Sequence, residues 1–215
     1  MKVISVNVGK QDEISWRGRV VKTGIFKVPV MGKVRVEKLG LAGDVQMDRA
    51  VHGGFDKALY VYPSEHYDPW RSELPSGALE RFGYGAFGEN LTIEGLMEDE
   101  VCVGDELIIG SARFLVKSPR IACYKLATKL GVGDMLKRFG PSGRSGFYLS
   151  VEEEGELAVG DAIAFGARAD DTINIADLNR LLTTDPHNHT LLEAALASFD
   201  LPKDTRDYLV STHGS

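Results

Sequence analysis

The chain has 215 residues, of which 43% are hydrophobic and 26% are charged, a balance that is ordinary for a globular protein with a buried core. Its formal net charge of −6 at pH 7 argues against nucleic acid as a partner, and no stretch approaches the roughly 18 uninterrupted apolar residues that a membrane span requires. The first ten residues lack the pattern of a signal peptide, and the chain contains only two cysteines. We therefore expect a cytoplasmic protein that binds neither nucleic acid nor a membrane.

Alternating hydrophobic patterns predict a β-rich region along the first part of the chain. β-Branched and polar residues alternate in segments that glycine and proline separate, which favours short turns and antiparallel pairing. The predicted strands span residues 3–8, 20–28, 34–39, 58–62, 91–93, 105–109, 113–117, 146–151 and 162–165. Short helices are predicted over residues 64–67, 126–130 and 132–139.

The hydrophobic period changes to that of helices in the last part of the chain. Apolar residues recur at helical spacing in three segments, 175–182, 191–199 and 202–209. Asn174 and Asp177 have the spacing of a capping box at the start of the first segment. We therefore predict a β-rich domain over residues 1–168 and a three-helix module over residues 169–215.

The segment around Cys123 joins a predicted strand to a predicted helix. Cys123 lies near the helix N-terminus and between two cations, Arg120 and Lys125. The helix dipole and the nearby cations both favour the thiolate, which is the form that acts as a nucleophile or as a metal ligand. The alternative is that Cys123 is a small apolar residue that fills the joint. For the second cysteine, Cys102, that core-filling role is favoured.

A loop rich in glycine and charge precedes the fourth predicted strand. It contains Gly53 and Gly54 beside His52, Asp56 and Lys57. Such a loop is typical of anion or cofactor binding, because glycine lets backbone N–H groups approach a ligand closely. The alternative is a surface turn, since surface loops are commonly rich in glycine and aspartate.

Three motifs in this order resemble the MOSC domain family. They are Gly43-Asp44 through His52-Gly53-Gly54-Phe55-Asp56-Lys57-Ala58-Leu59-Tyr60, then Gly88-Glu89-Asn90-Leu91, and then Pro119-Arg120-Ile121-Ala122-Cys123-Tyr124-Lys125-Leu126. The closer resemblance is to the YiiM-type subgroup, in which a MOSC domain is followed by three helices called the 3-alpha domain. It covers nearly the whole chain and implies a mainly β fold with helices (α+β), in which a MOSC-type β-barrel domain precedes a small three-helix module.

The resemblance implies that the protein binds the molybdenum cofactor, a molybdopterin that carries molybdenum. The family's single cysteine, thought to ligate the metal, matches Cys123, and a thiolate suits so soft a metal centre. His52 is the candidate proton donor by chemical type. Ile121 and Ala122 depart from the pattern, because a polar residue and a proline are expected there. The residues expected to hold the cofactor around Cys123 are Gly53, Gly54, Asp56, Lys57, Glu89, Asn90, Arg120, Lys125 and Arg144.

The resemblance also implies an activity. Proteins of this type are associated with the two-electron reduction of N-hydroxylated compounds, including N-hydroxylated purine base analogues, to the amines, which detoxifies base-analogue mutagens. Two other functions stay open at this point. One is a non-catalytic carrier that passes molybdenum cofactor or sulfur to another protein. The other is a thiol hydrolase in which Cys123 works with His52 or His66.

The C-terminal helices are expected to dock an electron donor, a flavin or iron–sulfur reductase. Their acidic edges would steer the encounter with this partner; these edges are Asp185, Asp200, Asp204 and Asp207. The alternative is that the helices cover an exposed part of the barrel, alone or within a homodimer, because apolar stripes at helical spacing are usually core.

Overall fold

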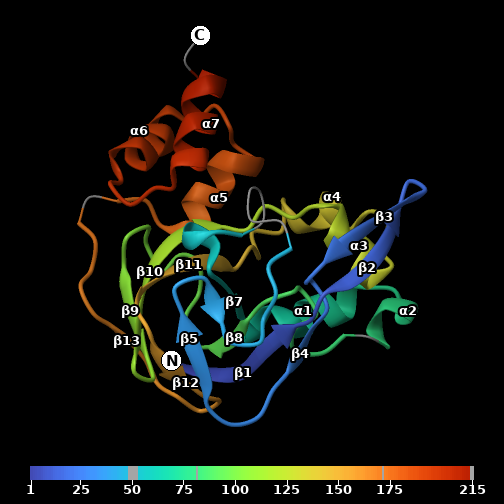
Figure 1. Cartoon of the computed structure of the whole chain (residues 1–215). Helices are drawn as coiled ribbons and strands as arrows, with labels where there is room; N and C mark the ends of the chain where they lie inside the picture. The colour runs from blue at the N-terminus through green and yellow to red at the C-terminus, as the bar shows by residue number, and fades with distance from the viewer. Residues whose placement is uncertain (48–52, 81, 171, 214–215) are drawn as a thin grey trace.

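Eight strands form the central sheet of the protein. The computed structural model describes residues 1–47, 53–80, 82–170 and 172–213. In spatial order the strands are β13 (Ile163–Phe165), β9 (Glu106–Ile109), β10 (Ala112–Pro119), β11 (Phe147–Glu153), β7 (Leu59–Pro63), β8 (Leu91–Glu94), β1 (Lys2–Gly9) and β4 (Lys27–Pro29). Neighbouring strands pair antiparallel except β7 and β8, which run parallel (Figure 1).

Two smaller sheets complete the β structure. In one of them β5 (Val34–Glu37) lies between β12 (Gly155–Leu157) and β6 (Gly40–Leu41). The other is a hairpin of β2 (Asp12–Trp16) and β3 (Arg19–Thr23), which projects from the rest of the molecule in Figure 1. The prediction of one strand over 20–28 is wrong, because β3 ends at Thr23 and β4 begins at Lys27 in a different sheet. At Gly24 a Cβ would lie 2.0 Å from the carbonyl oxygen of Val45, so the backbone itself packs closely there.

The central sheet does not close into the predicted barrel. Its edge strands, β4 and β13, do not pair with each other among the residues that the structure describes. β4 has only three residues and ends at Pro29, which has no N–H to donate to a further ladder. Instead, a single bridge joins Lys2 to Ala162, and Val3 exchanges backbone hydrogen bonds with Asp161 and Gly160 at 2.9 Å. The α+β fold is confirmed, but its sheet stays open.

Strand β7 is buried on both faces because it separates two hydrophobic cores. Leu59 and Val61 belong to the larger core, which lies within the central sheet and under the C-terminal helices. Tyr60 and Tyr62 point the other way and belong to a second core that is rich in aromatic residues. This alternation follows from the two-residue period of a strand.

Short helices cover the aromatic core. They are η2 (Ser64–His66), α1 (Tyr67–Glu73), α2 (Ser76–Leu79), α3 (Tyr124–Leu130) and α4 (Met135–Phe139). A further short helix, η1 (Phe55–Lys57), lies against β11 instead. Trp70 of α1 and Phe139 of α4 stack at 6.2 Å between ring centroids, and both contact Phe87. These contacts hold the helices against the face of the sheet that carries Tyr62.

The chain ends in three helices, α5 (Ile175–Thr183), α6 (His189–Ala197) and α7 (Lys203–His213), which gather at one end of the sheet (Figure 1). The capping pair predicted for the first is present, since the Asn174 side chain accepts from the Asp177 N–H at 2.7 Å. Buried residues of these helices, among them Leu178 and Leu209, share the core of the sheet. The division at residue 168 into two domains therefore stays a prediction. Within the described ranges, no helix is long and apolar enough to cross a membrane.

The four acidic residues expected to form a docking edge are all paired within the chain. Their pairs are Asp185 with Arg180 at 3.4 Å, Asp200 with Lys117 at 3.3 Å, Asp204 with Lys57 at 2.6 Å and Asp207 with Lys203 at 2.5 Å. Two of these pairs join the C-terminal region to η1 and β10. Asp200 and Asp204 therefore tie the helices to the sheet, and docking of an electron donor at the acidic edges stays a prediction.

Candidate functional site

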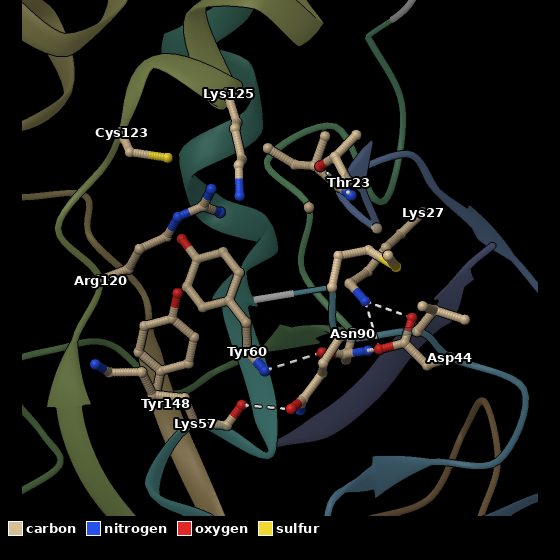
Figure 2. Close-up of a pocket in the computed structure, with 16 residues that line it drawn as sticks. Thr23, Lys27, Asp44, Lys57, Tyr60, Asn90, Arg120, Cys123, Lys125 and Tyr148 are labelled. Carbon is tan, nitrogen blue, oxygen red and sulfur yellow. Dashed lines mark hydrogen bonds and ion pairs between the residues drawn. The ribbon is translucent and has the colours of Figure 1, made fainter. Parts of the chain in front are cut away.

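A cavity of about 100 Å³ lies beside Cys123. Its walls come from segments that are far apart in the sequence: the turn after β3, residues 44–47, β7, the pair Gly88 and Asn90, and the Cys123 segment. Figure 2 shows Cys123, Arg120 and Lys125 on one side, facing Lys27, Asp44 and Asn90 on the other. The cavity therefore places a thiol opposite a cluster of buried charges.

Asp44 is the centre of the polar cluster. Its side chain is only 3% exposed, and Lys27 Nζ lies 2.5 Å from both of its carboxylate oxygens. Asn90 Nδ2 donates to Oδ2 at 2.8 Å and the Gly9 N–H donates to Oδ1 at 2.7 Å. Because removing a charge from water costs several kcal/mol unless the charge is paired and hydrogen-bonded, these three partners explain how the buried carboxylate is accommodated.

Lysine and arginine outnumber carboxylates around the cavity. Burial lowers the pKa of Lys27, although Asp44 opposes the shift. Burial also lowers the pKa of Lys129 to about 8, and its Nζ donates to the carbonyls of Ile25 at 2.8 Å and Gly85 at 2.5 Å. Arg120 is buried as well and lies 4.6 Å above the ring of Tyr60. Such a positive surface in a cavity favours an anionic ligand.

Arg120 is held from two sides. Its guanidinium donates to the carbonyl of Phe87, and its charge acts on the Cys123 thiol. Gly88 follows Phe87 with a φ of 81°, a conformation that glycine adopts without strain. A Cβ there would lie 2.8 Å from the Ile25 side chain and 3.7 Å from Arg120 Nη1. The glycine therefore lets this turn pack closely against Ile25.

Cys123 is the N-cap residue of α3 and is half-buried. The ring of the next residue, Tyr124, stacks on Trp16 of β2 at 4.7 Å between centroids, which fixes the start of the helix against the β2–β3 hairpin. The strand–helix joint predicted from the sequence is therefore present, with the sulfur on the cavity side (Figure 2).

Comparisons with known proteins identify the family. Residues 48–164 match the MOSC domain. The chain is also 38% identical, over 204 residues, to the uncharacterized protein YflK of Bacillus subtilis, an alignment that covers 95% of this chain and 90% of that protein. This chain belongs to the MOSC domain family. The crystal structure of YiiM from Geobacillus stearothermophilus superimposes on 98% of the chain, with 97% of that protein covered, a TM-score of 0.79 and 34% identity.

A further relative of this MOSC protein is described as a reductase. It comes from Gibberella moniliformis and is 30% identical over 166 residues, which are 77% of this chain and 29% of that protein.

Four of the residues expected to hold a cofactor line the cavity with Cys123. They are Lys57, Asn90, Arg120 and Lys125. Asn90 does so at the start of β8, where its Oδ1 also accepts from the Tyr60 N–H at 3.1 Å. His52 lies outside the described residues, so its role as proton donor stays a prediction.

Glu89 does not face the cavity. Its side chain is fully buried and accepts from the N–H groups of Gly85 at 2.7 Å and Phe87 at 3.0 Å, as well as from the hydroxyls of Thr92 and Tyr67. The carboxylate therefore orders the turn before β8, and the interpretation of Glu89 as a pterin acceptor is corrected.

Arg144 lies with the aromatic core. Its guanidinium lies 4.3 Å above the Trp70 ring and pairs with Glu73 at 2.6 Å. Asp56 is also directed elsewhere, because its carboxylate lies 3.7 Å from Lys117 Nζ. Neither residue lines the cavity, so the expectation that both converge on Cys123 is wrong.

Gly53 and Gly54 contact Gln46, a residue of the cavity wall. The Gly54 N–H donates to Gln46 Oε1 at 3.1 Å, and a Cβ on Gly53 would lie 2.6 Å from the same oxygen. Gln46, by contrast, lines the cavity. The two glycines therefore fix the position of Gln46 and do not themselves contact the cavity, which corrects their expected role.

Among the lining residues outside the motifs are Lys27 and Tyr148, and Tyr60 lies in a motif but is not among the residues expected to bind the cofactor. Tyr148 pairs with Tyr60 across β11 and β7, which brings the two rings to 5.2 Å between centroids. Burial raises the pKa of both phenols, so both keep their protons at neutral pH. Only the pairing of the strands brings them together.

Proposed function

We propose that this protein is a molybdenum-cofactor-dependent oxidoreductase that reduces N-hydroxylated compounds, such as N-hydroxylated purine base analogues, to the amines and thereby detoxifies them. The observation that carries the proposal is the placement of the Cys123 thiol beside Arg120 and Lys125 in one cavity. Membership in the MOSC family and the relative described as a reductase support the same reading.

The residues present fit such a cofactor by their chemistry. A thiolate is the protein ligand expected for a soft, sulfur-bound metal, and Cys123 is the thiol of this cavity. Lysine and arginine side chains are the usual partners of a phosphate group, and Arg120, Lys125 and Lys57 line the same walls. The amide of Asn90, held between Asp44 and Tyr60, suits recognition of a polar ring edge.

The proposed reaction takes two electrons and two protons, converts R–NHOH to R–NH₂ and releases water. When bound, the cofactor supplies the electrons, which a flavin or iron–sulfur reductase would replace. The chain's part is to position the substrate and to provide protons. Tyr60 and Tyr148 hold O–H protons beside Arg120, since burial raises the pKa of each phenol, and His52 stays the predicted donor to the leaving hydroxyl.

Replacement of the thiol tests this function. Cys123→Ser should retain little molybdenum and lower reductase activity by at least about a hundredfold, because a hydroxyl is a poor ligand for a soft metal. Metal content is measured by mass spectrometry on protein from a molybdenum-replete host, activity with a chemical reductant, and folding by circular dichroism.

Cys102→Ser is the matched control. Cys102 is also half-buried, but it lines neither this cavity nor the larger one between Cys123 and α7. Burial, with the Asp105 carboxylate nearby, raises the pKa of its thiol, which disfavours the thiolate. This variant should keep both metal and activity. Metal loss confined to Cys102→Ser would reverse the assignment, and metal retained by the wild type without turnover would favour a carrier.

A further inference from the structure

A second and larger cavity, of about 430 Å³, lies on the other side of Cys123. Lys57, Cys123 and Tyr148 line both cavities, so the thiol lies where the two meet. The volume falls within the range of about 300–1,000 Å³ that is usual for small-molecule sites.

The C-terminal helices supply the far wall of this second cavity. Asp204, Thr205 and Tyr208 of α7 line it, together with Leu182 of α5. Positions four apart on a helix share one face, so Asp204 and Tyr208 line the cavity one turn apart. The near wall is the segment that leads from β10 to Cys123.

The lining is mostly apolar with a few polar groups. Pro119, Ile121, Ala122 and Leu182 contribute aliphatic surface, and Tyr148 and Tyr208 contribute rings. Hydrogen-bonding groups come from Ser118, Thr205, Asp204 and Lys57. A flat ring system with apolar faces and polar edges matches such a lining, because its faces can pack against tyrosine rings while its edges reach hydroxyl and carboxylate groups.

Two large side chains that line this cavity are exposed to solvent. Ile121 and Tyr208 are each 52% exposed, although they come from opposite walls. Apolar surface gathered around a concavity is typical of a ligand-binding site.

We propose that this second cavity binds the substrate, a planar heteroaromatic base that carries an amine or hydroxylamine group, with Tyr208 stacked on the ring. The orientation of the ligand rests on the proposed function. The nitrogen to be reduced points towards Cys123, where the two cavities meet. In this arrangement α7 sets which substrates fit. The Lys57–Asp204 ion pair, at 2.6 Å, closes the rim between η1 and α7.

The experiment measures binding of adenine, the product of such a reduction, to the full-length protein. Tyr208→Ala should weaken adenine binding about tenfold in calorimetry, because loss of a stacking ring commonly has an effect of this size. Tyr208→Phe keeps the ring and should bind near the wild-type value. Val210→Ala is the matched control, since Val210 lies on the same helix with the same 52% exposure but does not line the cavity.

A second readout locates the ligand. Adenine should slow alkylation of Cys123 by iodoacetamide in molybdenum-free wild-type protein and have less effect in Tyr208→Ala. Steady-state kinetics with N-hydroxylated adenine should show a raised KM in Tyr208→Ala and a smaller change in kcat.

The outcomes separate this inference from the function on which it rests. Suppose that the wild type reduces hydroxylamines, but that Tyr208→Ala binds adenine as tightly as the wild type and has the same KM. This result would overturn the cavity assignment and leave the proposed function standing. Adenine binding that depends on Tyr208, in a protein that neither retains molybdenum nor reduces the substrate, would support the cavity and reject the function.

Discussion

The charges around the candidate site are desolvated before any ligand arrives. Asp44 has Lys27, Asn90 and the Gly9 N–H as partners, whereas Lys129 donates to the carbonyl groups of Ile25 and Gly85. A buried ammonium that meets dipoles in place of a carboxylate keeps a large part of its desolvation cost. Burial therefore favours the neutral amine of Lys129 more than water does.

The burial of Lys129 predicts a pH-dependent stability. Its pKa falls from the ordinary 10.5 to about 8 in the folded protein, so between these values the unfolded chain binds more protons and stability rises with pH. Relative to Lys129→Met, the free energy of unfolding of the wild type should increase from about pH 7 to pH 10, by up to about 3 kcal/mol.

Urea denaturation at several pH values measures this difference. Lys137→Met, at an exposed position of α4, is the control for the loss of a lysine. A difference between wild type and Lys129→Met that stays constant across this pH range would contradict the assignment of a depressed pKa.

At the level of elements, β7 organises the site. It pairs parallel with β8, which brings Asn90 beside Tyr60, and antiparallel with β11, which brings Tyr148 beside the same residue. Arg120, at the end of β10, then lies over the Tyr60 ring. One strand therefore collects side chains from three others on the side that faces Cys123.

The contact of α7 with η1 predicts a salt-dependent stability. Burial alone would raise the pKa of Asp204, but the hydrogen bond and charge of Lys57, with help from Thr205, lower it. This stabilisation is present above the ordinary value of 3.8 and is lost as the pH falls through the lower folded value. Since the side chain is 59% exposed, Asp204→Asn should cost no more than about 1 kcal/mol at neutral pH.

Denaturation at low and high salt tests this contact. The cost of Asp204→Asn should shrink as salt is added, because salt screens exposed charges. Asp207→Asn is the control: its pair with Lys203 lies within α7, so its loss does not release the helix from η1. Equal costs for the two variants at every salt concentration would show that the Lys57–Asp204 pair does not anchor the helix.

Across the whole molecule, the sheet and the C-terminal helices form one core. Buried residues such as Val116 of β10 and Leu178 of α5 belong to the same hydrophobic cluster, and α5 packs against β10. The second cavity lies between these parts, so the same helices that complete the core also complete the proposed substrate site.

Removal of residues 171–215 should therefore destabilise the protein. Loss of the helices exposes apolar core surface at about 25 cal/mol per Å², which a marginally stable domain cannot absorb over a large area. We expect the truncated chain to aggregate or to bind a hydrophobic dye, measured by light scattering and fluorescence. A truncated chain that stays soluble, binds molybdenum and works with a chemical reductant would instead support the helices as a docking surface for the electron donor.

Local patterns in the sequence determined where the C-terminal helices lie and where the Cys123 helix begins. The helical stripes after residue 175, the Asn174 cap and the strand–helix joint at Cys123 could be predicted, because hydrophobic period and capping depend on residues a few positions apart. The motifs also brought attention to Lys57, Asn90, Arg120 and Lys125, which share a cavity with the thiol.

Only the tertiary structure decided which polar groups face that cavity. Glu89 and Asn90 are neighbours in one motif. The Glu89 carboxylate accepts hydrogen bonds from the turn before β8, whereas the Asn90 amide donates to Asp44. Tyr148 and Lys27 join them through strand pairing, which sets Tyr148 opposite Tyr60 and Lys27 opposite Gly9. The physical reason is that periodicity specifies which face of an element is buried, whereas the strand order specifies what that face meets.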